Sequence, residues 1–151
     1  MSQPSRTPLV SRLATVRAVL GRVPQSVFSL LFRVSVGAVF FKSGLVKIQS
    51  WDTTVGLFRD EYALPLLPPH VAAYLGTAAE LICPVLIVLG LFARLGAAAL
   101  FAMTMVIQVL VYPENWAEHL MWASLLGFII TRGPGTLSLD APIAHQLFGR
   151  P

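Results

Sequence analysis

Four apolar runs follow one another along the chain, at residues 26–48, 70–91, 95–112 and 116–131. Each is close to the ~20 residues that an α-helix needs to cross a hydrocarbon layer of ~30 Å, although the last two are short for that distance. The short turns FARL, around Arg94, and YPEN, at 112–115, separate the last three runs. The pattern predicts an all-α polytopic membrane protein, an antiparallel bundle of four transmembrane helices.

Residues 49–69 make a sizeable loop between the first two runs. Within it, one helix face would carry Trp51, Val55, Phe58 and Tyr62. Ser50 or Asp52 can cap the start of this helix, and Pro65 helps to end it. We expect a short extracytoplasmic interfacial helix, which either anchors the loop to lipid headgroups through its aromatic side chains or forms a lid over a site.

The chain divides into a basic segment at 1–25, the membrane domain at 26–131 and a tail at 132–151. In the first segment an apolar stripe is formed by Leu9, Leu13, Val16 and Leu20, which fits a helix lying on an anionic leaflet, with a disordered basic tail as the alternative. Seven Lys and Arg residues fall on the side of the two termini and two on the other side. This bias predicts that both termini are cytoplasmic and that the protein is a multi-pass protein of the inner membrane.

Composition supports a membrane protein and limits its chemistry. Of the 151 residues 56% are hydrophobic and 12% are charged, and the mean hydropathy is +0.73. The net charge of +4 comes from basic residues scattered over the tail and loops, so no nucleic-acid partner is expected. Cys83 is alone, and a dithiol couple therefore cannot form within the chain. A redox role would need an external partner or cofactor.

Charged residues inside the apolar runs are the candidate chemistry. Lys42 and Lys47 lie near the outer end of the first run, where both can extend toward the interface and serve as donors. Arg33 lies near the limit of what its side chain can span to reach water, and Glu80 lies too deep to reach it, where a lone charge costs about 2.5–3.5 kcal/mol. We therefore predict that Arg33 pairs with Glu80, either to fix the helix register or to form a functional polar site.

Other polar side chains could join that site. Thr104 and Gln108 are one turn apart in the third run, and His119 lies one turn into the fourth. His119 is either a hydrogen-bonded helix-end residue or a group suited to proton transfer. The Met residues, Cys83 and His119 do not have the spacing of a metal site, so no metal is expected.

Several segments resemble the DoxX family of small four-helix membrane proteins. The resemblance rests on RVSVGAVFFKSGLVK, AAELICPVLIVLGLFAR, HLMWASLLG and RGPGTLSLD, and it covers about residues 28–140. KIQSWDTT, EYALPLLPP and VYPENWAEH are similar to a subgroup encoded beside small metal-buffering peptides. By position, the family's polar signature falls on Arg33, Lys42, Lys47, Glu80, Arg94 and His119.

The resemblance implies a membrane subunit associated with a quinone-linked or oxidative or metal-stress redox system. The chain departs from a self-sufficient electron carrier because it lacks redox cysteines and a facing pair of haem-ligand histidines. A quinone could bind between the helices, with His119 or Lys42 as donors and Glu80 for the proton. The expected partners are the lipid bilayer and other membrane or redox proteins, and a homo-oligomer is compatible with the sequence. The alternative is a non-catalytic scaffold or small-solute conduit whose buried charges are structural.

Overall fold

The computed structural model describes residues 17–18, 21 and 23–149, and these residues contain helices and no strand. Its elements are α2 (Gln25–Gln49), α3 (Trp51–Leu57), the π-helix η1 (Phe58–Tyr62), α4 (Pro69–Leu89), α5 (Ala93–Val106), the π-helix η2 (Ile107–Val111), the 3₁₀-helix η3 (Pro113–Asn115), α6 (Trp116–Arg132) and α7 (Asp140–Phe148). The all-α prediction is therefore confirmed. Residues 1–16, 19–20, 22 and 150–151 lie outside the described residues, and the predicted N-terminal stripe falls among them.

Three helical stretches of the described chain are long and apolar enough to cross a membrane: Gln25–Gln49, Pro69–Leu89 and Ala93–Val111. They match three of the predicted runs to within about two residues. The last stretch combines α5 and η2. The fourth predicted run is present as α6, which has 17 residues. A fourth membrane crossing stays a prediction.

The ends of these helices follow from local chemistry. α4 starts at Pro69, whose fixed φ suits a first helical position and whose missing N–H would have no partner there. It ends at Leu89, and the next residue, Gly90, has a φ of +69° and donates its backbone N–H to the carbonyl of Ile87. Glycine adopts this left-handed conformation without the penalty that a side chain brings. The chain can therefore turn at once into α5.

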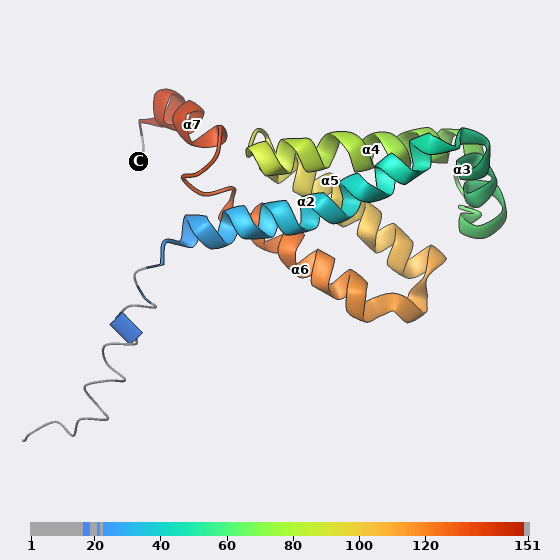
Figure 1. Ribbon diagram of the computed structural model, residues 1–151, viewed down its shortest axis with the longest axis horizontal. Coiled ribbons are helices and arrows are strands. Elements are labelled where there is room, and N and C mark those ends of the chain that lie inside the picture. The colour runs from blue at the N-terminus through green and yellow to red at the C-terminus, as the bar shows by residue number, and fades with distance from the viewer. Residues whose placement is uncertain (1–16, 19–20, 22, 150–151) are drawn as a thin grey trace, which may run out of the picture.

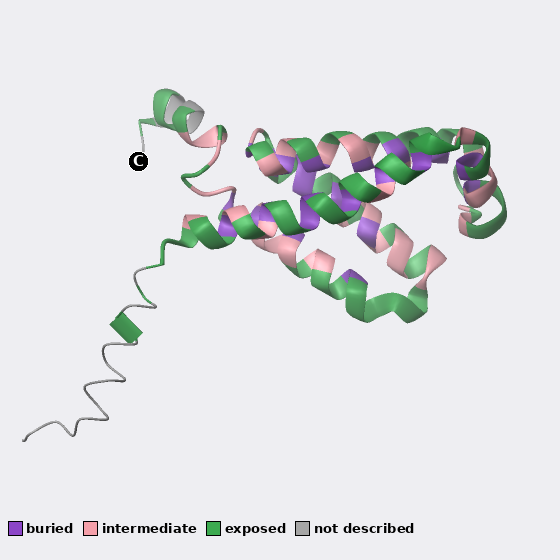
Figure 2. Cartoon of the chain, viewed as in Figure 1, coloured by how far each residue is buried: buried purple, intermediate pink, exposed green. Residues whose placement is uncertain are grey.

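Four helices pack around a shared apolar core, with α2 against α4, α4 against α5, α5 against α6 and α6 against α2. The buried apolar side chains at its centre are Val36, Phe40, Ile87, Ala93, Ala97, Leu100, Leu126 and Ile129. Figure 2 shows the exposed residues on the outer sides of these helices, and many of them are large and apolar. An apolar exterior over a packed core is what a lipid-embedded bundle requires.

The two ends of the bundle differ. Figure 1 places α3 and η1 at one end, which we call the loop end, and α7 at the other, which we call the tail end. At the loop end Val55 and Phe58 are buried with Ala72 and Ala73 of α4. The predicted apolar face of the loop helix is therefore confirmed, but it packs on protein. The anchor interpretation is wrong for Phe58, which is only 6% exposed.

Candidate functional site at the loop end

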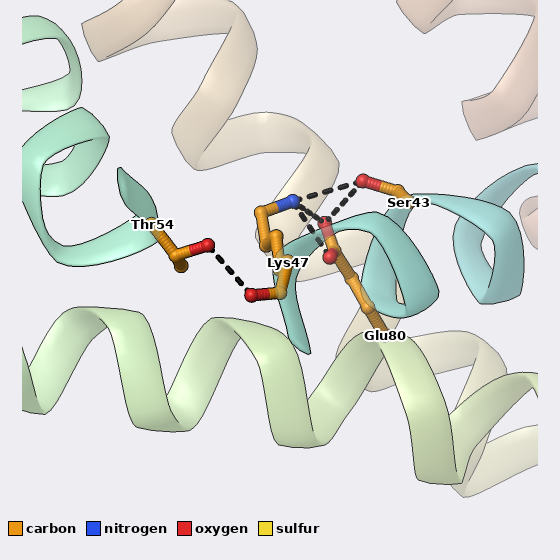
Figure 3. Close-up of polar contacts among 4 residues, drawn as sticks. All are labelled: Ser43, Lys47, Thr54 and Glu80. Carbon is orange, nitrogen blue, oxygen red and sulfur yellow. Dashed lines mark hydrogen bonds and ion pairs between the residues drawn. The ribbon is translucent and has the colours of Figure 1, made fainter. Parts of the chain in front are cut away.

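A buried ion pair joins α2 to α4 near the loop end. The ammonium of Lys47 lies 2.7 Å from both carboxylate oxygens of Glu80 and also donates to the Ser43 hydroxyl at 2.8 Å. Ser43 in turn donates to Oε1 of Glu80 at 3.2 Å, so three side chains form one closed network (Figure 3). Lys47 and Glu80 are 7% and 5% exposed. An ion pair buried this completely is stable only where the hydrogen bonds of both charged groups are satisfied.

The end of α2 is fixed where the pair forms. The hydroxyl of Thr54 in α3 donates to the carbonyl oxygen of Lys47 at 2.7 Å, which ties the first turn of α3 to the last turn of α2 (Figure 3). A Cβ at Gly44 would lie 3.1 Å from the Cβ of Glu80, so the missing side chain lets the two helices approach closely here. One turn from Glu80, the Thr77 hydroxyl is buried and has no hydrogen-bond partner among the described atoms.

The predicted pairing of Arg33 with Glu80 is wrong, and so is the expectation that Lys47 reaches the interface. The antiparallel register brings Gly44 opposite Glu80 and Gly37 opposite Pro84. Arg33 is eleven residues from Gly44, or about 16 Å along the helix. The prediction assumed that α2 and α4 start and end at the same depth. In the structure α4 extends past the end of α2, and its first turns pack against α3 and η1.

Arg33 instead caps α4 at the tail end. Its guanidinium donates to the carbonyl oxygens of Val88, at 3.1 Å, of Ile87, at 3.5 Å, and of Leu137. The last carbonyls of a helix have no partner within the helix, and a cation is favourable at the negative end of the helix dipole. Arg33 is 0% exposed and its Nε has no partner. This residue therefore holds the end of α4 and the segment after α6 together through their backbone carbonyls.

The chain after α6 returns to the same place. The carboxylate of Asp140 accepts hydrogen bonds from the backbone N–H groups of Phe92, at 2.9 Å, and Ala93, at 3.2 Å. The backbone N–H of Asp140 donates to the Gly90 carbonyl at 2.8 Å. Asp140 therefore caps the start of α5 while Arg33 caps the end of α4. The sequence analysis did not single out Asp140, although an acid at the end of the glycine-containing segment RGPGTLSLD was a usable signal.

A largely apolar pocket of about 230 Å³ lies beside the ion pair. It is lined by Phe58, Tyr62, Leu64, Leu67, Ala72, Leu75, Gly76, Ala79, Glu80, Met103, Val106, Ile107 and Val111. Both π-helical segments contribute, and π segments are rare and are frequent at functional sites. Leu75 and Val106 at the edge are exposed, so the pocket opens toward the lipid side of the bundle. Glu80 is the charged residue among those that line the pocket, and Tyr62 is the other residue with a polar side chain.

Tyr62, which lines the pocket, contacts Tyr112. Their rings meet edge to face with centroids 5.9 Å apart, and the Tyr112 hydroxyl donates to the Glu61 carboxylate. Burial raises the pKa of Tyr62, the negative charge of Glu80 adds to the shift, and the Tyr112 hydroxyl opposes it. Burial also raises the pKa of Tyr112, and the bond to Glu61 adds to that shift. Both phenols thus stay protonated over the ordinary pH range.

The comparison with protein families identifies the chain. The family model for DoxX matches residues 28–113. The chain belongs to the DoxX family. Searches of the curated proteins and of the solved structures find no match. The matched region of this DoxX protein contains both Lys47 and Glu80 and the residues that line the pocket.

The other predicted site residues do not join the pair. Thr104 donates to the Leu100 carbonyl of its own helix at 2.8 Å. Nδ1 of His119 lies 2.7 Å from Oε1 of Gln108, whose amide nitrogen donates to the Pro113 carbonyl at 2.9 Å. This second polar group ties α6 to the end of η2 and is separate from the Lys47–Glu80 network. Among the described residues no cluster of three His, Cys, Asp or Glu side chains could hold a metal ion.

Proposed function

We propose that this DoxX family membrane protein is a subunit of a quinone-linked or oxidative or metal-stress redox system, and that it binds the ring of a membrane-borne quinone-type compound at the loop end. The observation that carries the proposal is a buried ion pair whose acid is one of the residues that line a largely apolar pocket. Ligand sites are commonly apolar clefts with a few polar groups that orient the ligand.

The pocket has the size and surroundings that such a ligand needs. A volume of about 230 Å³ accommodates one substituted ring, while a long isoprenoid tail would have to lie outside. The exposed edge at Leu75 and Val106 gives that tail a route into the lipid. Phe58 and Tyr62, whose rings meet edge to face at 4.8 Å, offer aromatic surface to the ring.

The residues proposed to make polar contacts with the ligand differ from those that the sequence analysis expected. Lys42 is exposed on α2, and His119 is bonded to Gln108. Neither residue lines the pocket, whereas Glu80 and Tyr62 do. We therefore assign the polar contacts to Glu80 and Tyr62. Electron transfer within the chain is not part of the proposal, because Cys83 is its lone cysteine.

The proposed setting is the inner membrane, with four crossings, cytoplasmic termini and the loop end facing outward. Arg94 and Arg132 at the tail end and the positive-inside bias of the whole chain support this orientation. Other membrane or redox proteins are the proposed partners, with self-association as a further possibility to be measured in detergent.

The competing function is a scaffold whose buried charges only hold the bundle together. The tail end favours it, because Arg33 and Asp140 bond to backbone groups of the same chain. A conduit is favoured less, since Thr104 bonds to its own helix and the Gln108–His119 group lies apart from Glu80.

A pair of neighbouring alanines separates these functions. Ala79 lines the pocket, whereas Ala78 is exposed and does not line it. The protein is purified in mild detergent, and the quinones that co-purify are quantified by mass spectrometry. We expect wild type and Ala78→Phe to retain quinone and Ala79→Phe to lose most of it. Equal quinone in both variants, or none above the detergent blank in wild type, would exclude the pocket as a quinone site and favour the scaffold.

A further inference from the structure

We infer that the loop-end pocket discriminates between the two redox forms of its ligand and prefers the hydroxyl-bearing ring, a hydroquinone or related phenol, over the corresponding quinone. The inference rests on the proposed function, since it concerns the ligand of the same pocket. Its basis is a count of hydrogen-bond donors and acceptors at the pocket wall.

The donors of Lys47 are fully used within the protein. An ammonium group has three N–H bonds and no acceptor. Its three contacts are Oε1 of Glu80, Oε2 of Glu80 and the Ser43 hydroxyl, at 2.7, 2.7 and 2.8 Å. Lys47 is also not one of the residues that line the pocket. A quinone carbonyl needs a hydrogen-bond donor, and Lys47 could supply one only by giving up one of these three hydrogen bonds.

Glu80 offers the opposite polarity. Its Oε1 accepts from both Lys47 and Ser43, whereas Oε2 accepts from Lys47 alone. A carboxylate has about four acceptor positions, so at least one remains on the residue that lines the pocket. A hydroxyl that donates to it makes a charge-assisted hydrogen bond, roughly twice as strong as a neutral one. A quinone carbonyl in the same place would bring its acceptor oxygen against the carboxylate oxygen, with no hydrogen between the two.

The remaining polar side chain of the pocket does not reverse this preference. The Tyr62 hydroxyl can donate or accept and can therefore serve either redox form. The other lining residues are apolar and cannot select for redox state. Glu80 is thus the group that distinguishes the two forms.

Three probes of one ring shape test the inference: a short-chain hydroquinone, its quinone and its dimethyl ether, which lacks both O–H donors. Binding to the purified protein in lipid nanodiscs is measured anaerobically by equilibrium dialysis. We expect the hydroquinone to bind about tenfold more tightly than either of the other two probes. Ala79→Phe should abolish binding of all three, and Ala78→Phe should leave it unchanged.

Two variants assign the preference to its residue. Tyr62→Phe should keep the order of the probes, and Glu80→Gln should reduce the preference for hydroquinone severalfold, because an amide can also donate to a carbonyl. If Glu80→Gln does not fold because Lys47 is left unpaired, the double variant Lys47→Gln/Glu80→Gln takes its place. A preference lost in Tyr62→Phe, or kept in the Glu80 variant, would overturn the assignment to Glu80.

The outcomes separate the inference from the proposed function. Equal binding of hydroquinone and quinone, or tighter binding of quinone, would overturn the preference while the proposed quinone-type site stands. Binding of none of the three probes would overturn both.

Discussion

Arg33 and Lys47 lie on one face of α2, yet the protein uses them differently. At the tail end Arg33 bonds to carbonyl oxygens of Ile87, Val88 and Leu137, all of them backbone groups. At the loop end Lys47 bonds to the side chains of Glu80 and Ser43. The first arrangement completes helix ends, whereas the second joins an opposite charge across two helices.

The surroundings reinforce the difference. Arg33 is fully buried and packs closely on the end of α4, since a Cβ at Gly90 would lie 2.4 Å from a guanidinium nitrogen. Beside Glu80 lies a pocket of about 230 Å³. A buried cation is thus not by itself a sign of a ligand site in a membrane protein. What distinguishes the loop end is a charged side chain at a pocket wall, next to helix segments of irregular geometry.

The largest expected effect is a strong energetic coupling between Lys47 and Glu80. Glu80→Gln leaves the ammonium of Lys47 unpaired, and Lys47→Met leaves the carboxylate unpaired, so each should lower the free energy of unfolding by about 3–5 kcal/mol. The double variant Lys47→Met/Glu80→Gln should recover much of that loss, because neither charge then remains. Unfolding titrations in mixed micelles measure all three variants.

Two controls sharpen this prediction. Arg33→Met combined with Glu80→Gln should give losses that add to within about 0.5 kcal/mol, because the two residues share no partner. Lys42→Met removes an exposed cation from the same helix and should change the free energy of unfolding by less than about 0.5 kcal/mol. Additive losses for Lys47 and Glu80, or coupling between Arg33 and Glu80, would contradict the contacts described above.

An intermediate effect is expected at the tail end. Asp140→Asn keeps one acceptor oxygen in place of two for the N–H groups of Phe92 and Ala93, and it removes the negative charge from the start of α5. The expected loss is about 1 kcal/mol of unfolding free energy. Asp60→Asn is the matched control, because Asp60 is exposed and its ion pair with Arg59 is worth little. Equal losses in both variants would show that Asp140 does not cap α5.

The sequence was sufficient to predict the helices of the bundle and the loop, but not α7 in the tail and not the axial register between α2 and α4. Apolar runs bounded by Pro69 and Gly90 mark α4 because proline and glycine act on the backbone locally. The depth of Glu80 relative to α2 depends on how far α4 extends past α2, and therefore on how the loop helix packs. Gly37 and Gly44 lie on the face of α2 that packs against α4, but the face of a helix does not define its axial offset from the neighbouring helix.

Only part of the candidate site could be predicted from the sequence, again because the axial register of the helices could not be predicted. Lys47 and Glu80 were both singled out, whereas their pairing, the role of Ser43 and the pocket depend on the register. Asp140 and the backbone N–H that it caps are 48 positions apart, so the acid is visible in the sequence but its partner is not. Charged residues within the apolar runs could be recognised from hydropathy, but their bonding partners could be identified only from the packed structure.

The smallest expected effect is a pH dependence confined to the loop end. Tyr62 and Tyr112 have pKa values raised above their ordinary value of about 10, first of all by burial. Below pH ~10 both phenols are protonated in the folded and the unfolded protein, so they add no pH dependence there. As the pH rises above that value, the unfolded chain loses these protons first and folding becomes less favourable. Thermal unfolding in detergent should therefore show a steeper loss of stability above pH ~10 in wild type than in Tyr62→Phe/Tyr112→Phe.

Tyr112→Phe alone also removes the bond to Glu61, so it should lower stability slightly at neutral pH and flatten the slope in part. An identical slope in wild type and the double variant would show that these phenols are not held in their protonated form by the fold.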